Sequence, residues 1–234
     1  MRSYLIVDDN RAFAENLGEI LADTGAHVDL ADCGGEALER ARATRYDALI
    51  TDMKMPGMNG AELVHQLHAL DPGLPAVVIT AYTNDEDLAA ARREGLLAVL
   101  PKPAPVGRLL EIMAGARRDG LAVIVEDDVA LADNLSELLR SRGFAAVTAG
   151  SILETDLLGP VHPFIGLVDL RMPGGPDGAA LARLRAKFPA LPLLIVTAHA
   201  DVAPTTPHVA VFTKPFDSAA LLAAVEQVFA ARPR

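Results

Sequence analysis

The sequence predicts an α/β protein with two domains, each built on a five-stranded parallel sheet. The chain has 234 residues, which is enough for two domains of ordinary size. One pattern of residues occurs twice, about 117 positions apart. Within each copy, short unbroken apolar runs alternate with stretches of helical periodicity. This alternation is typical of a parallel sheet whose strands are buried on both faces between helices.

The repeat consists of four motifs that occur in the same order in both halves. An acid pair comes first, then a single acid before a Met-Pro-Gly turn, then a threonine, and last a lysine followed by proline. The paired positions are Asp8-Asp9 with Glu126-Asp127, Asp52 with Asp169, Thr80 with Thr197, and Lys102 with Lys214. We therefore place the domains at residues 1–117 and 118–234, with the seam in the glycine-flanked stretch Gly115–Gly120.

Each motif follows an apolar run, and these runs are the predicted strands. In the first half they are Leu5–Val7, Ala48–Ile50, Ala76–Ile79 and Leu96–Leu100. The runs are continuous rather than alternating, as expected for strands covered on both faces. The helices are predicted from apolar residues at i, i+4, i+7 and i+8. That spacing gives one face with Phe13, Leu17, Ile20 and Leu21, and a second with Leu131, Leu135, Leu138 and Leu139. The closing helices are predicted over Ala104–Arg117 and Ser218–Ala231.

The fourth helix is where the two halves differ. Lys102 comes 22 positions after Thr80, which leaves room for a helix that ends at Gly95. Lys214 comes only 17 positions after Thr197, and prolines interrupt this segment. We therefore predict that helix four of the second domain is reduced or absent.

The composition excludes several classes of protein. The net charge of -10 repels a phosphate backbone, so direct binding to nucleic acid is not expected. The N-terminus lacks the apolar segment of a signal peptide, and no apolar stretch is long enough to cross a membrane. Cys33 is the only cysteine, which fits a reducing compartment. We expect a cytoplasmic protein without membrane contact.

The repeated polar residues predict a site at the carboxyl ends of the strands, where an open parallel sheet collects its functional groups. Three carboxylates in each half repel one another unless a cation balances them, and oxygen-only ligands favour Mg²⁺ or Mn²⁺. A hydroxyl and an ammonium nearby suit a phosphoryl group, and carboxylate nucleophiles do form aspartyl-phosphates. Each residue also has a simpler interpretation: the acids as helix caps, the threonine as a strand-end hydroxyl, the lysine as a solvated loop residue. Recurrence of the whole set in both halves favours the shared site.

At this point the residues closely resemble the receiver domains of bacterial response regulators, present twice in tandem. The resemblance implies two flavodoxin-like (βα)5 domains that transfer a phosphoryl group from a histidine kinase onto their own aspartate. Asp52 and Asp169 then resemble the phosphoacceptors. The implied Mg²⁺ ligands are Asp8, Asp9 and Asp52 with the Lys54 carbonyl, and Glu126, Asp127 and Asp169 with the Arg171 carbonyl. Thr80 and Thr197 resemble the switch hydroxyl, and Lys102 and Lys214 the phosphate-binding lysine.

The chain departs from the family pattern three positions before each lysine. Receiver domains usually carry an aromatic residue there that rotates with the threonine, whereas this chain has Val99 and Val211. A β-branched valine does not swing between buried and exposed rotamers in that way. Tyr82 and His199, two positions after each threonine, are not direct equivalents of that aromatic residue.

The expected function is a response regulator that accepts phosphate from a histidine kinase or phosphotransfer protein and signals through altered protein binding. The resemblance is also compatible with a homodimer, a phosphorelay or phosphate-sink pair, or the regulatory part of a longer protein with a C-terminal effector. No enzymatic activity is expected beyond Mg²⁺-dependent self-phosphorylation and autodephosphorylation. A phosphatase acting on small molecules through an aspartyl-phosphate, and a degenerate receiver pair that no longer accepts phosphate, are the less favoured alternatives.

Overall fold

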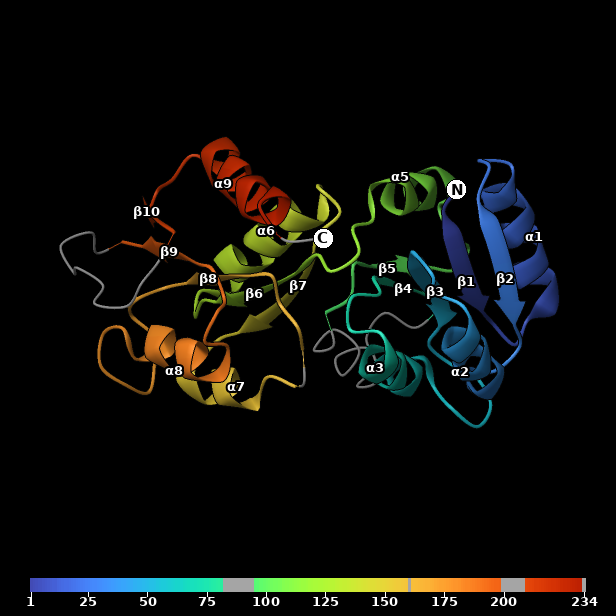
Figure 1. Ribbon diagram of the computed structural model, residues 1–234, viewed down its shortest axis with the longest axis horizontal. Helices are drawn as coiled ribbons and strands as arrows, with labels where there is room; N and C mark the ends of the chain where they lie inside the picture. Colours follow the sequence, from blue (N-terminus) through green and yellow to red (C-terminus); the bar gives the residue numbers. More distant parts are fainter. Residues whose placement is uncertain (82–94, 160, 199–208, 233–234) are drawn as a thin grey trace. The chain divides into compact units, whose positions relative to one another are not determined.

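The computed structural model describes residues 1–81, 95–159, 161–198 and 209–232, and these fold into two compact units. The first unit is Met1–Asp119 and the second is Gly120–Arg234. Each contains one five-stranded sheet in which every strand is parallel to its neighbours. The described helices lie on both faces of each sheet, so the predicted α/β class and flavodoxin-like architecture are confirmed (Figure 1).

The first sheet has the strand order β2-β1-β3-β4-β5. Its elements in chain order are β1 (Ser3–Val7), α1 (Arg11–Ala22), β2 (His27–Ala31), α2 (Gly34–Ala43), β3 (Ala48–Asp52), α3 (Gly60–Leu70), β4 (Ala76–Thr80), β5 (Ala98–Pro101) and α5 (Val106–Gly115). The central register pairs Leu5 of β1 with Leu49 of β3. Successive residues of a strand point to opposite faces, so each strand contributes to two apolar layers.

Those two layers are the core of the first unit. Leu5 and Val7 pack with buried residues of α2 and α3, whereas Tyr4 and Ile6 pack with residues of α1 and α5. The continuous apolar runs in the sequence are explained by this double burial, because no strand position of β3 or β4 faces water.

The second sheet repeats this arrangement with the order β10-β9-β8-β6-β7. Its elements are β6 (Leu121–Val125), α6 (Val129–Arg140), β7 (Ala145–Ala149), α7 (Ile152–Leu157), β8 (Ile165–Val168), α8 (Ala179–Lys187), β9 (Leu193–Thr197), β10 (Ala210–Thr213) and α9 (Ser218–Ala230). In Figure 1, α7 and α8 lie on one side of this sheet and α6 and α9 on the other.

The boundaries of several elements differ from the sequence prediction. Strand β5 begins at Ala98, because Leu96 and Leu97 precede the ladder and pack in the two cores on either face. The first closing helix begins at Val106, since Pro105 caps it in an extended conformation. The apolar runs did not mark β2, an edge strand with mostly half-buried positions that include Asp29.

The sequence prediction for the fourth helix of each domain concerns residues that the structure does not describe. The predicted reduction of this helix in the second unit concerns residues 199–208, which are not described. Within the described part of the chain, no helix combines the length and apolar composition that a membrane crossing requires.

Candidate functional site

The predicted site residues lie at the carboxyl ends of the strands in both units. In the first unit Asp8 follows β1, Asp52 ends β3, Thr80 ends β4 and Lys102 follows β5. In the second unit Glu126 follows β6, Asp169 follows β8, Thr197 ends β9 and Lys214 follows β10. Parallel strands bring these ends to one edge of each sheet, and the four residues of each unit gather there.

A lysine joins two acids at each of these edges. Lys102 Nζ donates to Asp8 Oδ2 at 2.7 Å and to Asp52 Oδ2 at 2.9 Å. Lys214 Nζ donates to Glu126 Oε2 and to Asp169 Oδ2, both at 2.6 Å. In each unit the lysine therefore forms ion pairs with two acids. The lysine is 94 residues from the first acid in the first unit and 88 residues from it in the second. The two sites are built alike although their sequence spacings differ.

Each site also brings three carboxylates together. Ligand oxygens of Asp8, Asp9 and Asp52 lie within 4.8 Å of one another, and so do those of Glu126, Asp127 and Asp169. Asp9 and Asp127 are exposed, whereas the other four are largely buried. Three oxygen donors, with one side open to water, suit a hard divalent cation that keeps part of its hydration shell. The donor set therefore fits Mg²⁺ or Mn²⁺.

The acids of the pair are not the helix caps. Asn10 Oδ1 accepts the N–H of Phe13, and Asp128 Oδ1 accepts the N–H of Leu131, both at 3.1 Å. The residue after each acid pair therefore caps α1 or α6. Asp9 and Asp127 are therefore not needed as caps, and each keeps an oxygen close to the other two acids of its site. The sequence analysis did not identify these two caps.

Burial governs the protonation of the site. It raises the pKa of Asp8 and of Glu126, because the carboxylate form loses hydration, and the neighbouring lysine offsets only part of this effect. Burial alone would lower the pKa of Lys102, but its hydrogen bonds to Asp8 and Asp52 raise it above the ordinary value. The pKa of Lys214 is raised in the same way by Asp169 and Glu126. Both lysines thus stay charged at neutral pH.

The turn after β3 in the first unit, and after β8 in the second, fixes the orientation of the central acid. Asp52 Oδ1 accepts the N–H of Met53 at 2.7 Å, so its two oxygens have separate partners. Gly60 closes the turn by donating to Met53 O, and a Cβ on Gly60 would lie 2.3 Å from Asp52 O. Only glycine fits this close approach.

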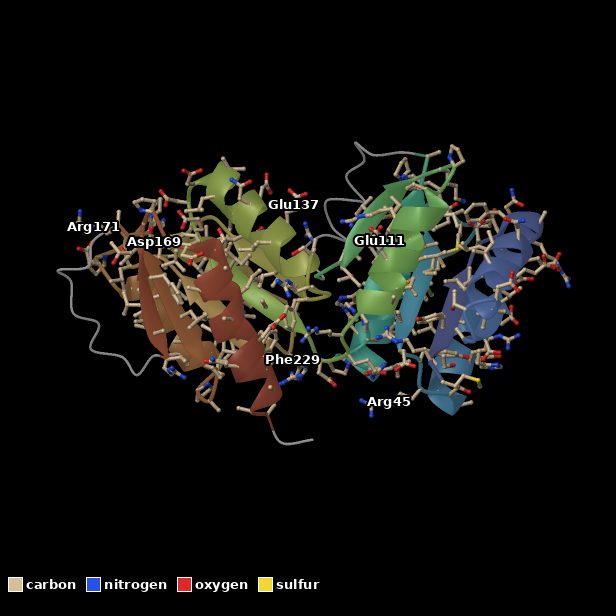
Figure 2. The ribbon with its side chains drawn as sticks, turned by 90° about the horizontal axis from the view of Figure 1, so that it is seen from above. Arg45, Glu111, Glu137, Asp169, Arg171 and Phe229 are labelled. Carbon is tan, nitrogen blue, oxygen red and sulfur yellow. The ribbon has the colours of Figure 1, made fainter. Side chains whose placement is uncertain are left out.

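The second unit closes the same turn with Gly178, which donates to Leu170 O and has a φ of 80°. Asp169 Oδ1 accepts from the N–H of Arg171 at 3.2 Å. Lys54 and Arg171 lie in these turns two residues after the central acid, and the role of their carbonyls as metal ligands stays a prediction. Figure 2 shows Asp169 and Arg171 at one end of the second unit, with Phe229 of α9 away from them.

The two threonines are fully buried strand ends beside the lysines. Thr80 and Thr197 have no exposed surface, and their carbonyls accept the N–H of Lys102 and Lys214 at 2.9 and 2.8 Å. Both lysines precede a proline through a cis peptide bond. Val99 packs partly buried against the core, whereas Val211 is 41% exposed. Tyr82 and His199 lie outside the described residues.

One residue of the first site was not recognised from the sequence. The Phe13 ring lies under Lys102, with Nζ 4.8 Å from the ring centroid. The helical periodicity of α1 identified Phe13 only as a core position. Its place at the start of the helix that follows the acid pair was the available signal, because that turn faces the same sheet edge.

Comparison with known proteins identifies the family. The family model described as "Response regulator receiver domain" matches residues 4–114 and 122–226. A response regulator receiver protein of Anaeromyxobacter sp. (strain Fw109-5) is 62% identical over 228 residues, covering 97% of this chain and 95% of that protein. The response regulator MprA of Mycobacterium ulcerans (strain Agy99) is 38% identical over 126 residues, covering 54% of this chain and 53% of that protein.

Among solved structures, a CheY-like response regulator receiver domain protein from Methanospirillum hungatei JF-1 has a TM-score of 0.47 and 31% identity. The match covers 49% of this chain and 91% of that one. The two family matches together span most of the chain and coincide with the two folded units. The protein therefore belongs to the response regulator receiver family and carries two receiver domains in tandem.

Proposed function

We propose that both domains accept a phosphoryl group, the first on Asp52 and the second on Asp169. The donor is a sensor histidine kinase or a phosphotransfer protein, and the output is altered binding of another protein. The observation that carries this proposal is the lysine that bonds the central acid and a second acid in each unit. With the third carboxylate, each edge has the charges that phosphoryl transfer requires.

Three carboxylates in each domain would hold the divalent cation. In the first domain these are Asp8, Asp9 and Asp52 with the Lys54 carbonyl, and in the second Glu126, Asp127 and Asp169 with the Arg171 carbonyl. Bound Mg²⁺ would offset the negative charge on the transferring phosphoryl oxygens.

The side chains of the chain perform the remaining steps. An oxygen of Asp52 attacks phosphorus, an O–P bond forms, and the bond from phosphorus to the donor atom breaks on the opposite side. Met53 N–H holds the other Asp52 oxygen at 2.7 Å, which fixes the direction of attack. Lys102 then has a phosphoryl oxygen to bond in place of the Asp52 carboxylate. Asp169 and Lys214 do the same in the second domain.

The signal arises when the phosphoryl group changes the hydrogen bonds around the buried threonine. A new dianion beside Thr80 or Thr197 draws the hydroxyl toward it and biases the following loop toward a second arrangement. Val99 and Val211 lack the aromatic ring that usually moves with this threonine. The aromatic half of the usual switch is therefore not expected in either domain.

This role makes the chain a cytoplasmic signalling protein rather than an enzyme with a separate substrate. Two complete sites in one chain also suit a phosphorelay or phosphate sink, in which one domain takes phosphate from a donor shared with another acceptor. A homodimer is compatible with either role.

The test is incubation with acetyl phosphate and Mg²⁺, followed by intact mass measurement. We expect one or two added phosphates in the wild-type chain, at most one in Asp52→Asn or Asp169→Asn, and none in the double variant. A chelator should abolish the adducts. A folded chain that binds Mg²⁺ yet gains no phosphate from any donor would contradict the proposal, as would rapid turnover of assorted phosphomonoesters.

A further inference from the structure

We propose that Phe13 is a positioning residue for Lys102, and that the face of its ring keeps the lysine ammonium beside Asp52. This inference rests on the phosphoryl transfer proposed above. It concerns the first domain only, because the second domain has no ring at the matching position.

The contact places an aromatic face against a cation that is largely shielded from water. Lys102 Nζ is 4.8 Å from the Phe13 ring centroid, within the range of a cation–π interaction. The side chain of Lys102 is 22% exposed, and Phe13 is half-buried against the core formed with α1 and α5. The ring quadrupole attracts the ammonium more strongly at such a site than in open water.

The matching residue of the second domain is Leu131. Phe13 and Leu131 each donate their N–H to the cap of their helix at 3.1 Å, so they occupy the same place in the first turn. Lys102 and Lys214 each bond two acids in the same manner. The two domains thus form a natural pair that differs in the ring beneath the lysine.

The ring supplies a contact that the carboxylates cannot maintain on their own. Asp8 and Asp52 are bonded to Lys102 and also belong to the set of oxygens that fits a divalent cation. A carboxylate oxygen shared with a dication is a weaker acceptor for the ammonium. The Phe13 ring is not a ligand, so its attraction for Lys102 persists when the carboxylates change partners.

The contact can be tested without any phosphoryl donor. Protons held over an aromatic face have NMR signals displaced to lower frequency, and we expect this for the ε-CH2 group of Lys102 in the full chain. Phe13→Leu should remove the displacement, whereas Leu131→Met should leave the Lys214 signals unchanged. Undisplaced Lys102 signals in the wild-type chain would overturn the proposal.

The effect on the rate of phosphorylation is measured in a chain that also carries Asp169→Asn, so that only Asp52 can accept phosphate. Phe13 is replaced by phenylalanines with one, two and three ring fluorines, which keep the shape and progressively weaken the attraction for a cation. We expect the rate of phosphorylation by acetyl phosphate to fall stepwise, by about two- to five-fold in total, with unchanged Mg²⁺ affinity. In the Asp52→Asn chain, Leu131→Met should leave the rate at Asp169 unchanged.

The outcomes separate the inference from the function on which it rests. If Phe13→Leu lowers the rate of phosphorylation but the fluorinated phenylalanines leave it unchanged, Phe13 has a packing role and the proposal is overturned. Displaced Lys102 signals in a chain that gains no phosphate would support the Phe13–Lys102 contact and contradict phosphoryl transfer instead.

Discussion

The two domains stabilise the amino ends of their sheets in different ways. At the entry to β3, the residue that bonds to the start of β1 is Asp47, which donates its N–H to Ser3 O and accepts the Ser3 N–H on Oδ2 at 2.8 Å. The corresponding residue at the entry to β8 is Phe164, whose ring centroid lies 5.1 Å from those of Phe144 and Phe229. Both residues donate their N–H to the start of the neighbouring strand, but the Asp47 side chain adds a hydrogen bond whereas the Phe164 side chain joins an aromatic cluster.

The arginines after the last helices follow the same division. Arg118 bonds both oxygens of Asp71, at 2.5 and 2.6 Å, and donates to the Tyr46 carbonyl. Arg232 instead stacks on the rings of Phe229 and Phe164, at 3.8 and 5.1 Å from their centroids. The site end is nearly identical in the two domains while the opposite end has diverged. The difference indicates that the chemistry depends on the residues at the carboxyl ends of the strands. The amino ends can be stabilised by different kinds of packing.

The largest expected effect is at Phe164. Phe164→Ala removes a buried ring from the aromatic cluster and should lower the free energy of unfolding of the second domain by about 3–4 kcal/mol. Asp47→Ala, the matched change in the first domain, should cost only about 1 kcal/mol. Urea titrations can separate the domains, because Tyr4, Tyr46 and Tyr82 are the only tyrosines, the chain lacks tryptophan, and all three lie before residue 120.

Tyrosine fluorescence therefore reports the first domain, and far-UV circular dichroism reports both. Phe164→Ala should move the dichroism transition and leave the fluorescence transition in place. Equal losses of unfolding free energy from Phe164→Ala and Asp47→Ala would show that the amino ends of the two sheets tolerate substitution equally, and would contradict the contrast between the domains.

The intermediate effect is at Arg118. Arg118→Ala leaves the half-buried Asp71 carboxylate without this guanidinium, and the first domain should lose about 2 kcal/mol of its free energy of unfolding. Arg232→Ala, which removes a cation stacked on rings, should cost the second domain about 0.5–1 kcal/mol. Added salt should reduce the Arg118 effect more, since an ion pair is screened. A salt-independent Arg118 effect would indicate packing of its aliphatic chain instead.

The sequence predicts the site better than it predicts these supports. Asp52 and Lys102 were identifiable because each follows an apolar run, and parallel topology brings the ends of these runs to one edge of the sheet. The same residue types recur in the second half, which favoured a shared site over separate roles for single residues. Asp29 broke the apolar pattern of β2, because an edge strand is covered on only part of its surface. Nothing in the sequence pairs Phe164 with Phe229, since such contacts depend on how α9 lies against the sheet. The Phe13–Lys102 contact could not be predicted either, because it depends on how α1 lies against the sheet.

After Phe164→Ala and Arg118→Ala, the third and smallest of the main effects is expected at Tyr46, a buried residue of the first domain whose hydroxyl donates to Asp29 Oδ2 at 2.6 Å. Tyr46→Phe removes this hydrogen bond and should lower the free energy of unfolding of the first domain by about 1 kcal/mol. Asp29 keeps its contact with His27 Nε2 at 3.3 Å, which limits the loss. The two remaining tyrosines still report the transition.

The Tyr46 contribution should depend on pH in one direction. Burial, together with the bond to Asp29, raises the pKa of Tyr46 from 10.0 to about 12. The folded state therefore holds this proton more tightly than the unfolded state does, and the associated stability is fully present below pH 10.0 and lost as the pH rises toward about 12. Unfolding followed by circular dichroism should show a constant difference between wild type and Tyr46→Phe up to about pH 9, and a shrinking difference above pH 10. A difference that grows with pH would mean that the phenolate, not the phenol, is the stabilised form, and would reverse the assignment of Asp29 as the acceptor.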